Sequence, residues 1–201
     1  MSLFAIADTH LSFSVDKPMD IFRGWQDFEK RLEKNWNSVV GEDDFVIIPG
    51  DVSWGMNMEE TLEDFRFLDS LNGTKIIMKG NHDYWWSTAA KFYKFCDENG
   101  FSDMFILNNN CYEYGDWTIC GTRGWFFEEE RSGAHDEKVF RRELCRLEAS
   151  LKAAGDKNKM VFLHYPPLYK GYECREILDL LEKYEVRRCY YGHLHGGSHG
   201  L

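Results

Sequence analysis

Short runs of apolar, β-forming residues alternate along the chain with longer amphipathic segments. The apolar runs predict buried strands at residues 3–7, 45–48, 75–78, 160–163 and 188–191. Between the first strands, apolar positions recur with a helical period and form two one-faced sets: Trp25, Phe28, Leu32, Trp36 and Val39, then Leu62, Phe65, Leu68 and Leu71. Strand and helix therefore alternate, which predicts βαβ units with parallel strands.

Polar and glycine residues mark the ends of the second helical pattern. Asn57 followed by Glu60 resembles a capping arrangement at its start. Asn72 with Gly73 predicts that the same helix ends there.

The middle of the chain has a different pattern. Residues 111–114 and 117–120 flank a Gly-Asp turn as the strands of an antiparallel hairpin would, so a second sheet is expected to begin here. A helix is expected from about residue 135 to 154, with four apolar residues directed inward: Phe140, Leu144, Leu147 and Leu151. The acidic run at residues 128–130 is expected to be a solvated loop.

Composition narrows the class of protein. The 201 residues are 43% hydrophobic and 16% aromatic, which predicts one compact folded domain over residues 1–201. A net charge of −10 opposes binding to duplex nucleic acid, because such binding depends on Lys and Arg neutralising phosphates. No signal peptide and no membrane-spanning stretch is evident, and no CxxC pair occurs among six cysteines, so reduced thiols and a cytoplasmic location are expected.

Five short polar clusters each follow a predicted strand. They are Asp8-Thr9-His10, Gly50-Asp51, Gly80-Asn81-His82-Asp83, His164 and Gly192-His193-Leu194-His195. Because the carboxyl ends of parallel strands converge on one rim, clusters far apart in the sequence are expected to meet in space. Five of the seven histidines lie in these clusters, which favours a functional site over chance placement.

The clusters have the composition and spacing of metal ligands. Alternate residues of an extended segment project the same way, so Asp8 with His10, and His193 with His195, can each face one centre. Carboxylate, imidazole and amide ligands without thiolate suit borderline divalent ions such as Mn, Fe, Zn, Co or Ni. The sequence leaves the identity of the metal open.

Each motif also has an ordinary structural interpretation. A DxH triplet is common by chance, Gly-Asp often forms a simple turn, and a single histidine such as His164 is more often structural than a ligand. The GNHD tetrad is more specific, because four specified residues occur by chance in about one chain in 1,000 of this size. The ordered set of five favours a metal site.

Together these motifs resemble those of the calcineurin-like metallophosphoesterase family, including its bacterial members. The ordered blocks DxH, GD, GNHD, a lone His and GHxH span nearly the whole sequence. The resemblance implies a four-layer sandwich of two mixed β-sheets flanked by helices. It also implies one metal held by Asp8, His10 and His195, another by Asn81, His164 and His193, and Asp51 as the bridge between them.

The resemblance further implies hydrolysis of a phosphate ester by a hydroxide held between two metal ions. His82 would be catalytic, and it is the candidate to protonate the leaving oxygen or to stabilise its charge. Asp83 is a weaker candidate to orient the His82 ring, since it could equally cap a helix opening near Tyr84. Arg123, in a loop at residues 121–125 that looks like one in bacterial members, is a weak candidate for binding substrate phosphate.

The substrate is expected to be a small phosphoester, and the sequence does not choose among monoester, diester, nucleotide and phosphoprotein. Two alternatives are a catalytically silent interaction module and a nuclease acting on single strands. The nuclease would use aromatic residues near the motifs, although packing explains these residues better: Trp54, Tyr84, Trp85, Trp86, Trp125, Phe126, Phe127 and Tyr165. The chain ends soon after the GHLHG block, so the second sheet is expected to lack some C-terminal strands of the family. The oligomeric state is left open.

Overall fold

A computed structural model describes residues 1–125 and 134–195. The chain divides into two compact units, Met1–Ile106 and Leu107–Leu201, each with its own main sheet and its own hydrophobic cluster. The prediction of a single domain over residues 1–201 stays a prediction. Among the described residues, no helix is both long enough and apolar enough to cross a bilayer.

The first unit contains a four-stranded parallel sheet in the order β1-β2-β3-β4. Its strands are β1 (Leu3–Ala5), β2 (Phe45–Ile48), β3 (Thr74–Ile77) and β4 (Met104–Ile106). The connections carry the helices α1 (Phe28–Val39), α2 (Leu62–Asp69) and α3 (Ala89–Asn99), and the short 3-10 turns η1 (Met19–Ile21) and η2 (Glu59–Thr61). The predicted βαβ alternation is confirmed, because three of the predicted strands, β1, β2 and β3, pair in parallel in this sheet.

One hydrophobic cluster joins the three helices to the sheet. Trp36 of α1, Phe65 of α2 and Phe92 of α3 pack with Ile48 and Ile77 of the central strands. Burying side chains of this size stabilises the unit by roughly 1.5–3 kcal/mol each. The cluster therefore fixes the sheet whose strand ends carry the candidate ligands.

Two details of the predicted helices are wrong. Val39 is 62% exposed, while its neighbour Val40 is buried, because Phe28, Leu32 and Trp36 are spaced by four residues and the buried face rotates along α1. Trp25 precedes α1 rather than lying on it.

The capping arrangement predicted for the second helix is present, but it lies at the start of η2, and α2 itself begins at Leu62 and ends earlier than predicted. The amide of Glu60 donates to Asn57 Oδ1 at 3.0 Å and the Asn57 amide group donates to Glu60 Oε1 at 3.0 Å, so the predicted capping arrangement is present. The helix ends at Asp69 rather than at residues 72–73. Leu71 lies beyond that end but remains buried.

The second unit has a mixed four-stranded sheet in the order β10-β7-β6-β5. Its strands are β5 (Tyr112–Tyr114), β6 (Trp117–Thr122), β7 (Asn158–Leu163) and β10 (Arg188–Tyr191), and a separate small ribbon pairs β8 (Leu168–Tyr169) with β9 (Tyr172–Glu173). The predicted antiparallel hairpin is confirmed as β5 and β6, whereas β6, β7 and β10 pair in parallel.

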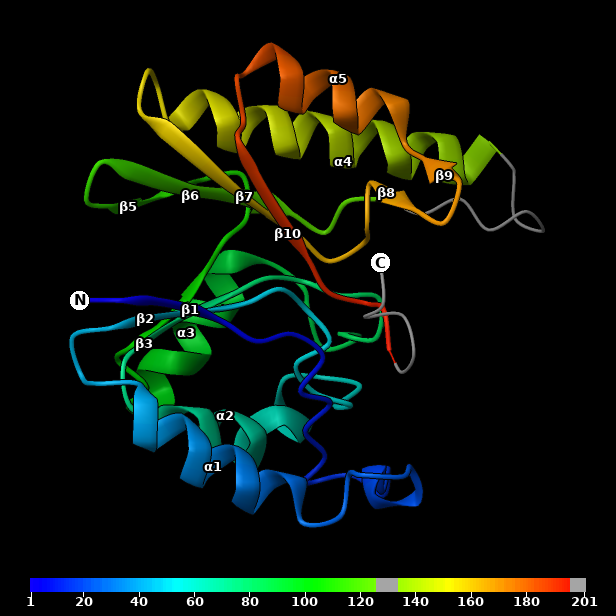
Figure 1. Cartoon of the computed structure of the whole chain (residues 1–201). Coiled ribbons are helices and arrows are strands. Elements are labelled where there is room, and N and C mark those ends of the chain that lie inside the picture. Colours follow the sequence, from blue (N-terminus) through cyan, green and yellow to red (C-terminus); the bar gives the residue numbers. More distant parts are fainter. Residues whose placement is uncertain (126–133, 196–201) are drawn as a thin grey trace. The chain divides into compact units, whose positions relative to one another are not determined.

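Two helices pack on one face of this second sheet. The helices α4 (Ala134–Ala153) and α5 (Arg175–Lys183) run side by side in Figure 1. Phe140, Leu147 and Leu151 of α4 pack against Val161 and other residues of the sheet, and Leu144 lies beside this cluster, as predicted. The acidic run at residues 128–130 lies outside the described residues. The two main sheets and their flanking helices confirm the predicted α/β class, with the first sheet parallel and the second mixed.

Candidate metal centre

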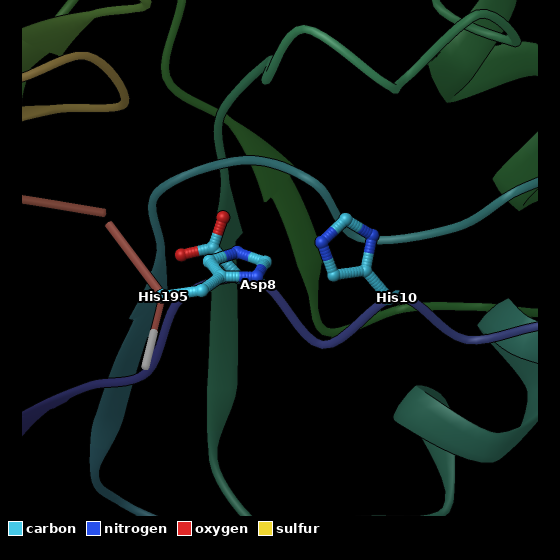
Figure 2. Close-up of side chains that lie close together, drawn as sticks. All are labelled: Asp8, His10 and His195. Carbon is cyan, nitrogen blue, oxygen red and sulfur yellow. The ribbon is translucent and has the colours of Figure 1, made fainter. Parts of the chain in front are cut away.

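The segments that follow β1 and β2 run beside one another and carry three of the candidate ligands. The amide of Asp8 donates to the Gly50 carbonyl at 3.2 Å, and that of His10 donates to the Asp51 carbonyl at 2.9 Å. Figure 2 shows the side chains of Asp8 and His10 on the loop after β1. Backbone pairing beyond the strand ends therefore holds the DxH and GD motifs together.

Four candidate ligands have a left-handed backbone conformation. The φ angle is 57° at Asp8, 46° at His10, 52° at Asp51 and 67° at His193. Residues other than glycine rarely adopt this region, and such strain collects at functional sites. The ligand atoms of Asp8 and His10 lie within 4.8 Å of each other, as expected, but a left-handed turn at each residue rather than an extended backbone sets their directions.

The GNHD loop approaches Asp51 closely. The amide of His82 donates to Asp51 Oδ1 at 2.8 Å. A Cβ atom at position 80 would lie 2.1 Å from that oxygen and 2.3 Å from the Asp51 amide nitrogen, so only glycine fits there. The Gly50-Asp51 and GNHD motifs thus form one structure.

Asp83 is fully buried and binds backbone rather than the His82 ring. Its carboxylate accepts hydrogen bonds from the amides of Asp51, Val52, Ser53 and Gly80 and from the indole of Trp85. The alternative helix cap near Tyr84 is wrong, since α3 begins at Ala89 with Thr88 as its cap. In the first unit Asp83 holds the two motif loops in place.

The electrostatics of Asp51 suit a cation. His10 Nε2 lies 3.8 Å from Asp51 Oδ2, a spacing compatible with two ligands on one ion at metal–ligand distances of about 2.0–2.2 Å. Burial raises the pKa of Asp51 from 3.8 to about 8; the amide of His82 opposes the rise and the carboxylates of Asp83 and Asp8 add to it. A cation would offset both burial and repulsion. The carboxylate and imidazole donors therefore fit a divalent metal.

The second unit presents three candidate histidines after β7 and β10. His164 is 0% exposed, and its amide donates to the Arg123 carbonyl at 3.0 Å. The amide of Gly192 donates to the Leu163 carbonyl at 3.2 Å, which places the GHLH segment beside the end of β7. The rings of His164 and His193 lie 5.1 Å apart, and His195 is exposed. Within this unit, His164 and His193 can therefore face a common centre.

Arg123 has a structural partner in the same unit. One of its guanidinium nitrogens lies 3.7 Å from a carboxylate oxygen of Glu143, and the guanidinium also lies over the rings of Trp125 and Tyr165. Glu143 is buried and accepts a hydrogen bond from Thr122. Whether Arg123 binds phosphate stays a prediction.

Sequence reasoning missed two buried carboxylates that support the site loops. Asp64 of α2 accepts hydrogen bonds from the Phe13 amide and from the hydroxyl of Ser53. Glu143 of α4 contacts Thr122 and Arg123. Each looks like one more charged residue on a solvated helix face, so the sequence carries no signal that separates them from their exposed neighbours. Their role becomes visible only when the loops are placed.

The aromatic residues near the motifs divide between core and surface. Trp85 is buried in the core of the first unit and Trp86 packs against it, as the packing interpretation predicts. Tyr84 is exposed. Phe126 and Phe127 lie outside the described residues.

The chain belongs to the calcineurin-like phosphoesterase family, whose model matches residues 1–197. This match confirms the resemblance drawn from the five sequence motifs. Membership supports metal-dependent hydrolysis of phosphoesters as the general activity of the chain.

Curated relatives share between a quarter and a third of the aligned residues. A glycerophosphodiester phosphodiesterase of Enterobacter lignolyticus is 28% identical over 97% of this chain and 71% of its own length. An uncharacterized protein of Methanocaldococcus jannaschii is 29% identical over 53% of this chain, and the match covers 58% of that protein.

Solved structures agree on the fold. The phosphopantetheinyl hydrolase of Mycobacterium tuberculosis matches with a TM-score of 0.57 at 18% identity, over 96% of this chain and 82% of that one. The protein TT1561 of Thermus thermophilus matches with a TM-score of 0.53 at 13% identity, over 94% of this chain and 80% of that one. At such low identity these likenesses support the fold alone.

Proposed function

We propose that this protein hydrolyses a small phosphate ester at a centre of two divalent metal ions. The observation that carries the proposal is the pairing of the DxH and GD loops, which sets His10 Nε2 3.8 Å from Asp51 Oδ2 on a strained backbone. A strained backbone at candidate ligands is expected where the binding of an ion compensates for the free-energy cost of the strain.

The proposed ligands fall into two candidate groups. By the family's motifs, Asp8, His10 and His195 would hold one ion, and His164 and His193 would hold the other. Asn81 would complete the second group and Asp51 would bridge the two ions, as the family's motifs imply.

Bound ions would activate water as the nucleophile and neutralise charge on the phosphoryl oxygens. Asp8 and Asp51 supply two negative charges against four on two divalent ions, so the site keeps a positive charge that attracts phosphate. The surface charge of −10 does not prevent this, because salt screens it beyond about 8 Å. His82 would protonate the leaving oxygen, a role worth roughly 10²- to 10⁴-fold in rate.

A phosphodiester is our first choice of substrate class. The relative that aligns with 97% of the chain is a glycerophosphodiester phosphodiesterase, which supports a diester over a monoester. Manganese is the metal we would test first among Mn, Fe, Zn, Co and Ni. We expect no binding to duplex nucleic acid or membrane. The six cysteines, all within the described residues and none in a disulfide, suit a cytoplasmic location.

The test is a panel of aryl phosphodiesters and phosphomonoesters assayed with protein reconstituted separately with each of the five metals. His82→Ala should reduce kcat by at least about 100-fold while the bound metal content, measured by elemental analysis, stays unchanged. His135→Ala is the matched control, because it removes a histidine outside the motifs. Two bound ions without turnover of any substrate would favour the silent interaction module, and salt-sensitive cleavage of single strands would favour the nuclease.

A further inference from the structure

Trp54 contacts both histidines of the first unit to which the proposed function gives roles. Its indole ring stacks on the ring of His10, with centroids 4.8 Å apart and planes 20° apart. The same indole lies 4.6 Å from the ring of His82 at a tilt of 51°. The two imidazoles are themselves 5.8 Å apart, so one side chain touches a candidate metal ligand and the candidate acid.

The Trp54 residue has further partners in the first unit besides the two histidines. The Trp54 amide donates to the Leu11 carbonyl at 2.9 Å, and the indole nitrogen donates to the sulfur of Met19 at 3.4 Å. Met19 is buried in η1, and the ammonium of Lys17 lies 5.9 Å from the centroid of the indole ring. These contacts leave the ring little freedom to turn, so its faces are presented in one orientation.

Among the residues that the structure describes, Trp54 does not belong to the hydrophobic cluster of the first unit. Trp85 and Trp86 belong to or pack against that cluster, with Phe65 and Phe92 as partners. The ring contacts of Trp54 are instead made to His10 and His82. A contribution to core packing alone therefore does not account for its position.

We propose that Trp54 is a positioning residue that sets the ring orientations of His82 and His10. This inference rests on the proposed function, since it assigns Trp54 to the same site. A histidine on a loop can occupy several rotamers, and a flat neighbour against the ring restricts this choice. Misplacing a catalytic group by about 1 Å can cost about 100-fold in rate. Outer contacts of a ligating histidine typically change metal affinity by about 10- to 100-fold.

The experiment compares two replacements of similar apolar character in the full-length protein. Trp54→Phe keeps a flat ring against the histidines, whereas Trp54→Leu fills part of the space without one. We expect Trp54→Leu to lower kcat by about 100-fold with little change in KM, and to weaken Mn²⁺ binding about tenfold. Trp54→Phe should stay within about fivefold of the wild type in both measurements.

Trp25→Leu is the matched control. Trp25 is also half-buried in the first unit and makes an edge contact with Phe28, outside the motif loops. Its replacement should leave kcat and Mn²⁺ affinity unchanged. Circular dichroism and urea unfolding of every variant separate loss of fold from loss of orientation.

The outcomes distinguish this inference from the proposed function. If Trp54→Leu matches the wild type in kcat and Mn²⁺ affinity, or if the Leu and Phe variants lose both equally, the positioning role is wrong. If the wild-type protein binds Mn²⁺ but hydrolyses no phosphoester, the proposed function fails. The Mn²⁺ titrations of the two variants then still decide whether Trp54 orients His10.

Discussion

Replacing Asp83 by Asn tests whether a buried carboxylate organises the two motif loops of the first unit. The Asp83 oxygens accept five hydrogen bonds. Oδ1 receives the amides of Val52 and Ser53 and the indole of Trp85, at 2.9, 3.3 and 2.9 Å. Oδ2 receives the amides of Asp51 and Gly80 at 2.8 and 2.7 Å. Asparagine has nearly the same shape but can place an acceptor at only one of these two positions.

The expected loss of stability follows from this count. The Asn carbonyl should take the position with three donors, which leaves its amide group facing the N–H groups of Asp51 and Gly80. Each buried donor left unsatisfied costs about 1–3 kcal/mol. Burial raises the pKa of Asp83, so removing its charge recovers part of that cost. We therefore expect Asp83→Asn to lower the free energy of unfolding by about 2–4 kcal/mol.

Urea unfolding followed by tryptophan fluorescence measures this change, since five of the seven tryptophans lie in residues 1–106. Hydrogen exchange of peptides covering residues 49–54 and 79–83 should show faster exchange in the variant. Asp16→Asn, at an exposed site, is the control and should stay within about 0.5 kcal/mol of the wild type. A change equally small in Asp83→Asn, with unaltered exchange in both peptides, would refute the assigned role.

Three further predictions concern the same loops. Gly80→Ala should weaken Mn²⁺ binding more than tenfold in calorimetric titrations, because the added Cβ would lie 2.8 Å from the carboxyl carbon of Asp51. Gly41→Ala is the control and should have no effect, because its Cβ would have only a 3.6 Å contact. Because the pKa of Asp51 is raised to about 8, Mn²⁺ binding at pH 7 should release a proton from its carboxyl group. Calorimetry in buffers of different ionisation enthalpy should detect this proton as a buffer-dependent binding heat, and the dependence should weaken above pH 8. The Asp51→Asn variant should not show this release. Burial also raises the pKa of Asp64 from 3.8 to about 6, so the folded state binds more protons than the unfolded state between these values. Stability should fall by up to about 3 kcal/mol as pH rises from 4 through 6, and urea titrations of Asp64→Asn should lack that fall.

The elements that can be predicted from the sequence are those whose signals are local and repeated. The strands β1, β2, β3, β7 and β10 follow from short apolar runs, and the β5–β6 hairpin follows from its Gly-Asp turn, whereas these patterns do not predict β4, β8 and β9. Phe140, Leu147 and Leu151 are recognisable as the buried face of α4 because three turns of helix repeat the same period. The same reasoning wrongly places Val39 on the buried face of α1. The buried apolar residues of this helix are spaced by four, so the buried face rotates along the helix and Val40 is buried instead.

The candidate site can be predicted from the sequence as a set of residues but not as a geometry. The motifs identify Asp8, His10 and Asp51 through residue type and order. Their left-handed backbone does not follow from the sequence, because no local rule predicts strain in a residue other than glycine. The role of Asp83 is equally hidden, since its partners Asp51 and Val52 lie about 30 positions away in the sequence.

The left-handed backbone at Asp8, Asp51 and His193 limits how this chain could drift into a silent relative. At these positions asparagine and glycine are tolerated, whereas valine, isoleucine or threonine would damage the loops themselves. A lineage that gave up catalysis but kept the fold would be expected to pass first through Asn or Gly at residues 8, 51 and 193. Such substitutions would form a recognisable fingerprint of a descendant that has lost its chemistry.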